Sequence, residues 1–369
     1  IHNKINGLIE NGFKVSLFVT GKRDPKVVPL SFPIYYQVNV NNKLYLLLTF
    51  ITTFILHPVT CFRFLSLERV THGDWRRALK NLIINFHIIG KSLDWIHFGF
   101  ATTGLGRENV AKAMGAKSAV SFRGFDIGLY PHQHSDCYNL LWEKIDKIHT
   151  ISDDLYQRAL DLGLNPHIPL EKITPAIKTE FFKSNSKKNL HNPLRILTIG
   201  RLTWKKGYEY ALKALSLLME KQINFEYHIV GEGNYREAIT YAIHQLNLTD
   251  NVILTGQISH QEVKKQMEWA DIYLQPSIQE GFCNAVLEAQ SMGLLCIVTD
   301  AEGLSENVVN GETGWVVIKR SPEKMVEVIF SILDMSINSL NRIRKNAVNR
   351  MREVFDLDLQ KNKFVEFYS

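Results

Sequence analysis

The sequence has few cysteines and no motif typical of a metal site. Its 369 residues include four cysteines, and none forms a C-x-x-C pair: Cys61, Cys137, Cys283 and Cys296. This spacing excludes a zinc finger and a disulfide framework, and it is typical of a reducing compartment. The D-x-D motif at residues 356–358 stands directly before a helical pattern, where an aspartate is expected to cap the helix. We therefore expect no metal site.

Long hydrophobic runs are also lacking. The uncharged apolar run at residues 44–56 has 13 residues, whereas about 20 are needed to cross a bilayer. Three interpretations of this run stay open: a buried helix, a partner-binding surface, or an interfacial patch that docks on anionic lipid. The third draws on the basic residues that follow the run: Arg63, Arg69, Arg76, Arg77 and Lys80.

Acidic residues are scarce in the first half of the chain. Residues 1–190 carry 24 Lys+Arg against 15 Asp+Glu, whereas the remaining 179 residues carry 19 against 22, which gives the total of +6. The basic residues show no interleaved aromatic platform, so nucleic-acid binding is not expected.

Two glutamates stand on either side of a predicted helix start. Residues 270–276 have the pattern of a short buried strand, and residues 282–292 have that of the helix after it. Glu280 therefore lies at the carboxyl end of a strand, where parallel sheets bind ligands, and the amides of residues 281–284 suit a phosphate or sugar oxygen. Glu288, about two turns into the helix, suits a pair of ribose hydroxyls. Taken alone, the pattern fits a purely structural interpretation equally well. In that interpretation one glutamate interacts with the helix dipole and the other lies on a solvated face.

A second segment has the form strand, basic loop, helix. Residues 195–199 are a β run, residues 200–207 form a loop, and residues 208–220 show helical apolar spacing. Arg201 offers a planar fork to phosphate oxygens and Lys206 a point charge, and neither is needed to fold a turn. The alternative is a solvated basic loop.

Alternating strands and helices predict two α/β domains. A polar stretch at residues 184–193 precedes strands near 195–200, 225–231, 251–255, 271–275, 294–299 and 313–317. Such alternation indicates a parallel, doubly wound sheet. The first half has strand patterns at 13–19, 95–98, 119–122 and 147–151, with helices near 106–115, 135–145 and 153–162.

Over roughly residues 195–317 the sequence resembles the family-4 retaining glycosyltransferases of the GT-B fold, also called group 1 glycosyltransferases. The resemblance rests on Gly200-Arg201-Leu202, Lys206-Gly207, Val230-Gly231-Glu232-Gly233, Leu254-Thr255-Gly256, Pro276-Ser277, the Glu280 to Glu288 motif and residues 300–307. It implies that Arg201 and Lys206 bind the donor diphosphate, and that Glu288 binds the ribose. It also implies a sugar site at Glu280 and the backbone of Gly281, Phe282, Cys283 and Asn284, and a nucleobase pocket lined by Gly231 and Gly256.

The resemblance implies two doubly wound Rossmann-like domains facing a cleft. Residues 1–190 would be the acceptor-binding domain, 191–350 the nucleotide-sugar donor-binding domain, and 351–369 a C-terminal helix that packs back on the first domain. Residues 1–12 form an amphipathic pattern that in the family follows a first strand and a glycine-containing loop. We therefore expect the first domain to lack its first strand; the alternative is an intact protein with a shorter first domain.

Three residues of the first domain are candidates for the acceptor or sugar side. His97 ends one predicted strand, while Arg123 and Asp126 follow the next. In the family the position of Arg123 is commonly a histidine, in a T-F-H-G-x-D pattern that touches the donor sugar. An arginine stays protonated and cannot act as a base, but it could hold a phosphate or carboxylate. A structural role for a strand-end histidine or arginine is the other interpretation.

The expected activity is that of a retaining hexosyltransferase-type glycosyltransferase (EC 2.4) in bacterial surface polysaccharide synthesis. It would move a sugar from a nucleotide diphosphate sugar to a glycan or lipid-linked acceptor, with Glu280, Arg201 and Lys206 as catalytic residues and without a metal or other cofactor. We expect a cytoplasmic protein, with peripheral attachment to the inner face of the cell membrane left open.

Two rival classes remain. The first is a non-catalytic GT-B-like binding protein. The second is a nicotinamide-dependent oxidoreductase, suggested by the glycines at 231 and 233, but position 236 is arginine where the third glycine of G-x-G-x-x-G would stand.

Overall fold

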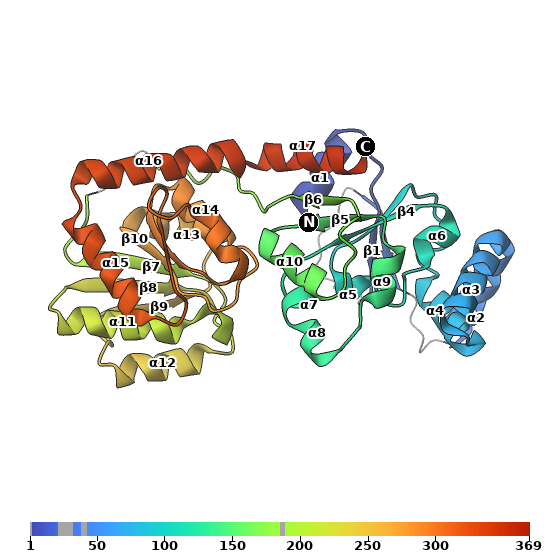
Figure 1. Cartoon of the computed structure of the whole chain (residues 1–369), viewed down its shortest axis with the longest axis horizontal. Helices are drawn as coiled ribbons and strands as arrows, with labels where there is room; N and C mark the ends of the chain where they lie inside the picture. The colour runs from blue at the N-terminus through green and yellow to red at the C-terminus, as the bar shows by residue number, and fades with distance from the viewer. Residues whose placement is uncertain (1, 21–31, 38–42, 185–188) are drawn as a thin grey trace. The chain divides into compact units, whose positions relative to one another are not determined.

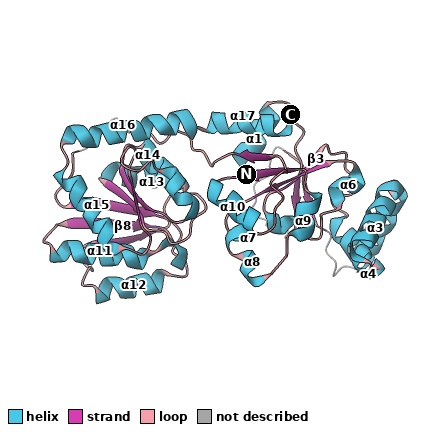
Figure 2. Ribbon diagram, viewed as in Figure 1, coloured by secondary structure: helices cyan, strands magenta, loops and turns pink. Residues whose placement is uncertain are grey.

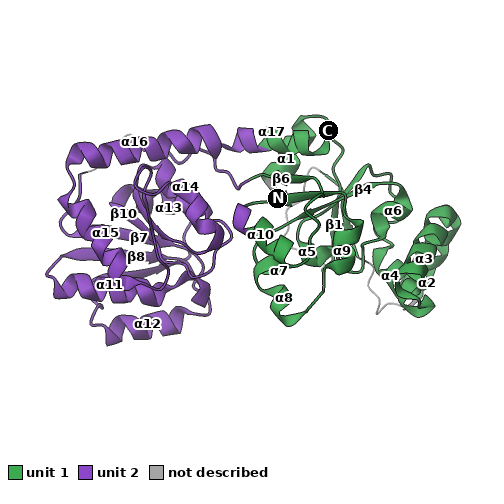
Figure 3. Cartoon of the chain, viewed as in Figure 1, with its two compact units in different colours: residues 1–151, 155–173, 361–369 green, residues 152–154, 174–360 purple. Residues whose placement is uncertain are grey.

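The chain divides into two compact units. The computed structural model describes residues 2–20, 32–37, 43–184 and 189–369. Unit 1 consists of residues 1–151, 155–173 and 361–369, and unit 2 of residues 152–154 and 174–360 (Figure 3). The sequence placed the division between residues 190 and 191, but the segment 174–190 belongs to unit 2 and the main division follows residue 173.

Unit 2 is built on one parallel six-stranded sheet (Figure 1). The strand order is β12-β11-β10-β7-β8-β9. The predicted doubly wound sheet is confirmed, and each strand begins and ends within about two residues of its predicted bounds. The strands are β7 (Leu194–Ile199), β8 (Phe225–Val230), β9 (Val252–Gly256), β10 (Ile272–Gln275), β11 (Leu295–Thr299) and β12 (Trp315–Val317).

Helices cover both faces of this sheet (Figure 2). Because side chains alternate along a strand, Ile196 enters the core cluster that includes α11 and α15, and its neighbour Leu197 enters the cluster that includes α13 and α14. Burial on both faces explains why the strands are nearly continuous apolar runs. The helices are α11 (Tyr208–Glu220), α12 (Arg236–Gln245), α13 (His260–Trp269), α14 (Asn284–Ser291), α15 (Pro322–Asp334) and α16 (Ile337–Val354).

Unit 1 contains a second parallel sheet. Its four strands are in sequence order, β3 (Trp95–Phe98), β4 (Lys117–Ser121), β5 (Lys147–Thr150) and β6 (Leu170–Lys172). A separate parallel pair is formed by β1 (Leu17–Val19) and β2 (Ile34–Tyr36). The helices predicted near 106–115, 135–145 and 153–162 correspond to α6 (Val110–Met114), α9 (Asn139–Lys144) and α10 (Asp153–Asp161).

The last helix, α17 (Leu357–Tyr368), ends inside unit 1. Its Phe364 and Phe367 are buried with Leu8 of α1 (His2–Glu10) and with Ala119 of β4. At its start, Asp356 Oδ1 accepts a hydrogen bond from the amide of Asp358 at 2.9 Å. The aspartate of the D-x-D motif thus caps the helix, as the sequence predicted.

The apolar run at residues 44–56 is a helix, and it belongs to a helical insertion between β2 and β3. The insertion consists of α2 (Lys43–Leu56), α3 (Pro58–His72) and α4 (Trp75–Asn85). Among the described residues no single helix is long and apolar enough to cross a membrane, and α2 and α3 meet that test only as a pair bent by 105°. One side of α2, with Phe50, Thr53 and Phe54, is buried or half-buried and the other side is exposed, so the helix is half-buried and a fully buried helix is excluded.

Candidate functional site

The candidate site lies where the sheet of unit 2 changes direction. From β7 the chain builds outward through β8 and β9, and it then returns to place β10 on the other side of β7. In a doubly wound sheet this switch point opens a crevice at the carboxyl ends of the two central strands, where ligands bind. The two loops that leave this edge are residues 200–207, after β7, and residues 276–283, after β10.

Lys206 and Glu280 join these two loops through an ion pair. The Lys206 ammonium donates a hydrogen bond to Glu280 Oε2, and the side chains are 15% and 18% exposed. Burial alone would lower the pKa of Lys206, but Cys283 and the Glu280 carboxylate beside the ammonium outweigh burial, so the Lys206 pKa is raised. Lys206 therefore keeps its charge at neutral pH. The contact also shows that Lys206 and Glu280 belong to the same site.

Backbone contacts fix the loop after β7. The amide of Ile278 donates to Lys205 O at 2.8 Å, and the Tyr208 hydroxyl donates to Gly200 O at 3.0 Å. At Gly207, φ is 62° and a Cβ would lie 2.2 Å from Pro276 O, so only glycine allows the two loops to come this close. The rigid loop positions both Lys206 and Arg201.

Arg201 lies exposed next to this pair. Among the residues that the structure describes, no side chain forms a hydrogen bond with its guanidinium. An unbonded guanidinium beside a fixed ammonium is a suitable arrangement for binding a diphosphate. The solvated-loop alternative does not account for the partly buried Lys206.

The loop after β8 packs on the loop after β7. A Cβ at Gly231, where φ is 143°, would lie 2.0 Å from Gly200 O, and the amide of Leu202 donates to Glu232 O at 3.0 Å. The Gly231 amide in turn donates to Gly256 O at 3.0 Å. These glycines let the loops contact one another, which removes the main support for a nicotinamide site.

At the start of α14, the side chains of two residues whose backbone was predicted to contact the donor are buried. Phe282 is buried, with its ring 5.8 Å from that of Phe355. Cys283 is also buried; its amide donates to Asn307 Oδ1 at 3.4 Å, and its carbonyl accepts from Asn307 Nδ2 at 2.9 Å. Burial raises the pKa of the Cys283 thiol to about 11. The Cys283 amide is therefore already used, whereas Asn284 is exposed at the helix start.

The sequence analysis assigned no role to Asn307 and Arg350. Asn307 lies in the 3-10 helix η2 (Glu302–Asn307) and clamps Cys283. Its carbonyl accepts from Gln290 at 2.8 Å and from Arg350 at 2.7 Å. Asn307 belongs to the motif at residues 300–307 that the sequence analysis singled out. The motif did not indicate that Asn307 would bind the backbone of Cys283.

Glu288 lies on α14 about one helical turn past Asn284 and is partly buried. Burial raises its pKa to about 7. Among the described residues no hydrogen bond to its carboxyl is found. A half-buried carboxyl without a protein donor is suited to accept hydrogen bonds from a ligand, and this fits the predicted ribose contact.

In unit 1, His97 takes part in a chain of hydrogen bonds that crosses three strands. His149 Nε2 donates to Ile173 O at 2.9 Å, so His149 Nδ1 accepts from the Ser121 hydroxyl at 2.7 Å. Ser121 then accepts from His97 Nε2 at 2.6 Å, and His97 Nδ1 accepts from the Tyr368 hydroxyl at 2.5 Å. Both ring nitrogens of each histidine have partners, so the structural interpretation of His97 is the better one.

The two histidines are neutral. Burial, with Lys4, His149 and Arg123 nearby, holds the pKa of His97 well below its usual range. Burial lowers the pKa of His149 to about 3, and Lys4 and Arg123 act in the same direction. Lys4 itself lies 3.3 Å from His97 Nδ1, and its pKa is lowered to about 7 by burial and by Arg123.

Asp126 is a structural residue. It is fully buried, and its two carboxylate oxygens accept from the amides of Ala101 and Arg123, each at 2.9 Å. It therefore ties the loop after β3 to the loop after β4, and its oxygens are not turned to a sugar. The Arg123 side chain forms no hydrogen bond with the described residues, so it stays a candidate for an anionic group.

Comparison with protein families and curated proteins gives one consistent result. Residues 179–350 match the family model described as glycosyl transferases group 1. The chain is 30% identical over 249 residues to the amylovoran biosynthesis glycosyltransferase AmsK of Erwinia amylovora, which covers 64% of this chain and 59% of that protein. It is 26% identical over 219 residues to the UDP-Gal:alpha-D-GlcNAc-diphosphoundecaprenol alpha-1,3-galactosyltransferase of Escherichia coli, covering 58% and 56%. The matches thus span under two thirds of both relatives.

Solved structures with this architecture cover nearly the whole chain. A glycosyltransferase from Rickettsia africae has a TM-score of 0.69 at 19% identity, over 100% of this chain and 93% of that one. The UDP complex of Alr3699/HepE from Anabaena has a TM-score of 0.68 at 14% identity, over 91% and 85%. These likenesses concern the fold, and the fold is GT-B, as the sequence predicted.

Proposed function

We propose that this chain transfers a sugar from a nucleotide diphosphate sugar to a glycan or lipid-linked acceptor. The match of residues 179–350 to the group 1 glycosyl transferases supports this activity. The setting would be bacterial surface polysaccharide synthesis. The name of the Erwinia relative supports the polysaccharide, and the name of the Escherichia coli relative supports an acceptor on a lipid diphosphate.

The observation that carries this proposal is the pairing of Lys206 with Glu280 at the switch point of the unit 2 sheet. The pair joins the basic loop to the glutamate loop, and the unbonded side chains of Arg201 and Glu288 belong to the same two segments. A diphosphate sugar requires cations for its phosphates and acceptors for its hydroxyls, and this group of residues supplies both.

The transfer would proceed by charge stabilisation. Departure of the sugar builds negative charge on the leaving phosphate, which Arg201, Lys206 and the free amides at the start of α14 stabilise. Glu280 orients the sugar, and its ion pair with Lys206 couples the sugar to the diphosphate. A leaving-phosphate oxygen takes the proton of the acceptor hydroxyl, so attack occurs on the same face and the anomeric configuration is retained. A nucleophilic role of Glu280 is the less favoured mechanism, since no second carboxyl group stands near it in the sequence.

No metal takes part in this proposal. Within the described residues no three His, Cys, Asp or Glu side chains gather in the geometry of a metal site. Lys206 and Arg201 would neutralise the diphosphate, a task that a divalent ion performs in other sugar transfers.

The test is calorimetry of the chain with a panel of UDP- and GDP-linked sugars in the presence of EDTA, followed by NMR of the first product. We expect binding of a nucleotide sugar without metal, and a product with the donor's anomeric configuration. Tight binding of NADH without nucleotide-sugar binding would contradict the proposal. Nucleotide-sugar binding without any turnover across acceptors would instead favour a non-catalytic binding protein.

A further inference from the structure

Helices α2 and α3 carry large apolar side chains on their outer side. They include Leu47, Ile51 and Ile55 of α2 and Val59, Phe62 and Val70 of α3, with Ile55 72% and Val70 82% exposed. Single exposed apolar residues are normal on a protein surface, but a series along two adjoining helices marks an interaction site. We call these six side chains the outer apolar residues.

The inner side of the same insertion is partly polar. Glu68 of α3 is fully buried and accepts from Asn81 Nδ2 at 2.6 Å and from Asn109 Nδ2 at 2.8 Å. Asn85 of α4 is also buried and donates to Gly106 O at 2.9 Å. The insertion therefore buries hydrogen-bonded polar groups as well as apolar side chains such as Phe64 and Leu82, and it still exposes aliphatic and aromatic groups that a surface helix usually keeps inside.

Apart from Tyr45, the exposed residues at positions 44–56 of α2 are aliphatic or threonine. Residues 44–56 carry no charge, and the three threonines satisfy their hydroxyls within the helix. Thr49 donates to Tyr45 O at 2.8 Å, Thr52 to Leu48 O at 2.8 Å, and Thr53 to Thr49 O at 2.7 Å. A protein interface usually has a polar rim with hydrogen bonds, whereas a hydrocarbon environment requires polar groups to be satisfied internally. Lipid therefore fits better than a protein.

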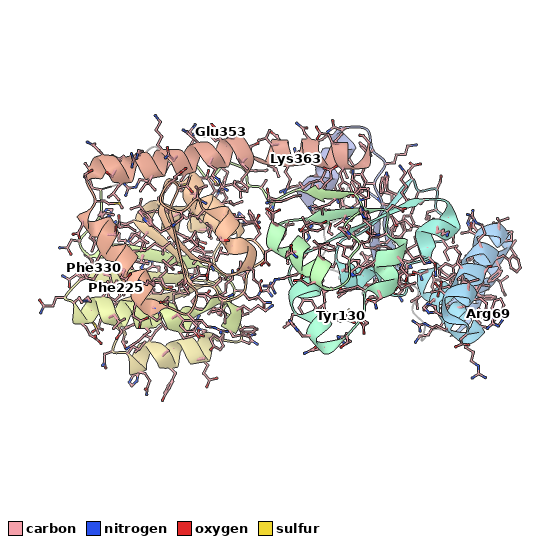
Figure 4. All side chains as sticks on the ribbon, in the orientation of Figure 1. Arg69, Tyr130, Phe225, Phe330, Glu353 and Lys363 are labelled. Atoms are coloured by element: carbon pink, nitrogen blue, oxygen red, sulfur yellow. The ribbon has the colours of Figure 1, made fainter. Side chains whose placement is uncertain are left out.

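The charge of the insertion matches an anionic surface. Residues 43–85 contain six Lys+Arg and two Asp+Glu. Glu68 is buried, and the exposed Asp74, which caps α4 by accepting from the amides of Arg76 and Arg77, offsets only part of the exposed positive charge. Arg69, labelled in Figure 4, lies 5.4 Å from the exposed Trp75 ring, and tryptophan is enriched at membrane interfaces. Basic side chains next to apolar ones are typical of helices that bind anionic bilayers.

We propose that α2 and α3 dock the chain on the surface of a bilayer that contains anionic lipid. The outer apolar residues enter the boundary between headgroups and acyl chains, and the exposed arginines contact the phosphates. The bend of 105° between the two helices fits a pair that lies in the interface. This proposal does not depend on the sugar transfer.

The test is co-sedimentation of the full chain with vesicles of phosphatidylcholine, with and without about a third of phosphatidylglycerol. We expect the chain to bind the mixed vesicles, and the triple variant Leu47→Ser, Ile51→Ser, Ile55→Ser to bind them at least about tenfold more weakly. The matched control changes two exposed isoleucines of unit 2, Ile253→Ser and Ile318→Ser, which are 45% and 61% exposed; its binding should equal that of the wild type. Circular dichroism shows whether each variant is folded, and if the triple variant is not, the single variants Ile55→Ser and Val70→Ser replace it.

A second variant separates the charge from the apolar contribution. Replacing Arg69, Arg76 and Arg77 by Gln leaves the Asp74 cap in place, because that cap uses backbone amides. We expect this variant to lose the preference for mixed over neutral vesicles. Equal vesicle binding by the wild type and a folded serine variant would overturn the proposal. It would equally fall if the wild type ignored vesicles while sedimentation velocity showed self-association, or association with a protein, through the outer apolar residues.

Discussion

At the carboxyl ends of its central strands, unit 2 presents a charged pair, whereas unit 1 presents a chain of neutral hydrogen bonds. Lys206 and Glu280 pair directly beside the unbonded guanidinium of Arg201. His97 and His149, in contrast, are connected through Ser121 and use all their ring nitrogens within unit 1. The same position in two parallel sheets is thus prepared for a ligand in one unit and satisfied by the protein itself in the other.

Two lysines make this difference measurable. Lys206 has a carboxylate partner, and its pKa is raised although burial opposes the charge. Lys4 has no carboxylate within ion-pair distance among the described residues, and burial together with Arg123 lowers its pKa to about 7. Lys206 therefore keeps its charge at neutral pH before any ligand binds. In unit 1 an anionic group near Lys4 would raise that pKa again.

Breaking the charged pair should have the largest effect. We expect Glu280→Gln to lower turnover by about 10²–10³-fold, because the sugar loses its orienting carboxylate and Lys206 loses its partner. Steady-state kinetics with the donor and acceptor found by the panel measures this change. The control is Glu312→Gln, which removes an exposed carboxylate elsewhere in unit 2. Unchanged turnover in a folded Glu280→Gln protein would remove Glu280 from the mechanism.

Removing the cation of the pair should act mainly on binding. We expect Lys206→Met to weaken UDP-glucose binding by about 10²-fold, since a partly buried charge contact to the diphosphate is lost. Uridine, which lacks phosphate, should bind equally to both proteins. The neighbouring Lys205→Met is the matched control, because Lys205 contacts the other loop through its backbone carbonyl. Equal loss of uridine and UDP-glucose affinity would indicate a damaged fold and not a lost phosphate contact.

The sheet of unit 2 could be predicted from the sequence because its strands are buried on both faces. Residues 195–200 were predicted as a strand, and β7 spans Leu194–Ile199. The loops at residues 200–207 and 276–283 could be predicted as ligand loops, because each follows the carboxyl end of a predicted strand and carries residues of the family resemblance. The ion pair could not be predicted, because Lys206 and Glu280 are 74 positions apart and their contact depends on β10 lying next to β7.

Unit 1 was less predictable for physical reasons. The strand β6 has three residues, too few for a period to show. The partners of His97 lie 24, 93 and 271 positions away, on β4, on α1 and at the end of α17. An apolar run such as residues 44–56 has the same pattern whether a helix faces a core or a lipid, so only the structure could show that it is exposed.

Asp126 distinguishes a structural role from a sugar contact in unit 1. We expect Asp126→Ala to lower the free energy of unfolding of unit 1 by about 1–3 kcal/mol, because the buried amide of Ala101 and the partly buried amide of Arg123 lose their acceptor. UDP-glucose affinity, which the proposed function places in unit 2, should stay unchanged. Urea unfolding and calorimetry measure the two quantities, with the exposed Asp94→Ala as the control. Normal stability with a loss of transfer would show instead that Asp126 contacts a substrate.

The smallest effect is expected from Glu288, and it depends on pH. Burial raises the pKa of Glu288 to about 7. Only the ionised carboxylate has both oxygens available as acceptors for the two ribose hydroxyls, because protonation turns one oxygen into a donor. UDP-glucose carries a constant charge around neutral pH, so its affinity for the wild type should rise about tenfold from about pH 6 to about pH 8. The affinity of Glu288→Gln should be weaker at high pH and nearly independent of pH.

The same substitution should change stability in the opposite direction. A carboxyl whose folded-state pKa lies above its unfolded value of 4.5 destabilises the free protein once it ionises. Stability is therefore lost as the pH rises from about 4.5 to about 7, and at pH 8 Glu288→Gln should melt at a higher temperature than the wild type without ligand. Saturating UDP-glucose should reduce or reverse this difference, because ligand binding adds stability according to affinity. A lower melting temperature of the free variant at pH 8 would mean that Glu288 stabilises the fold and is not a ligand-binding residue.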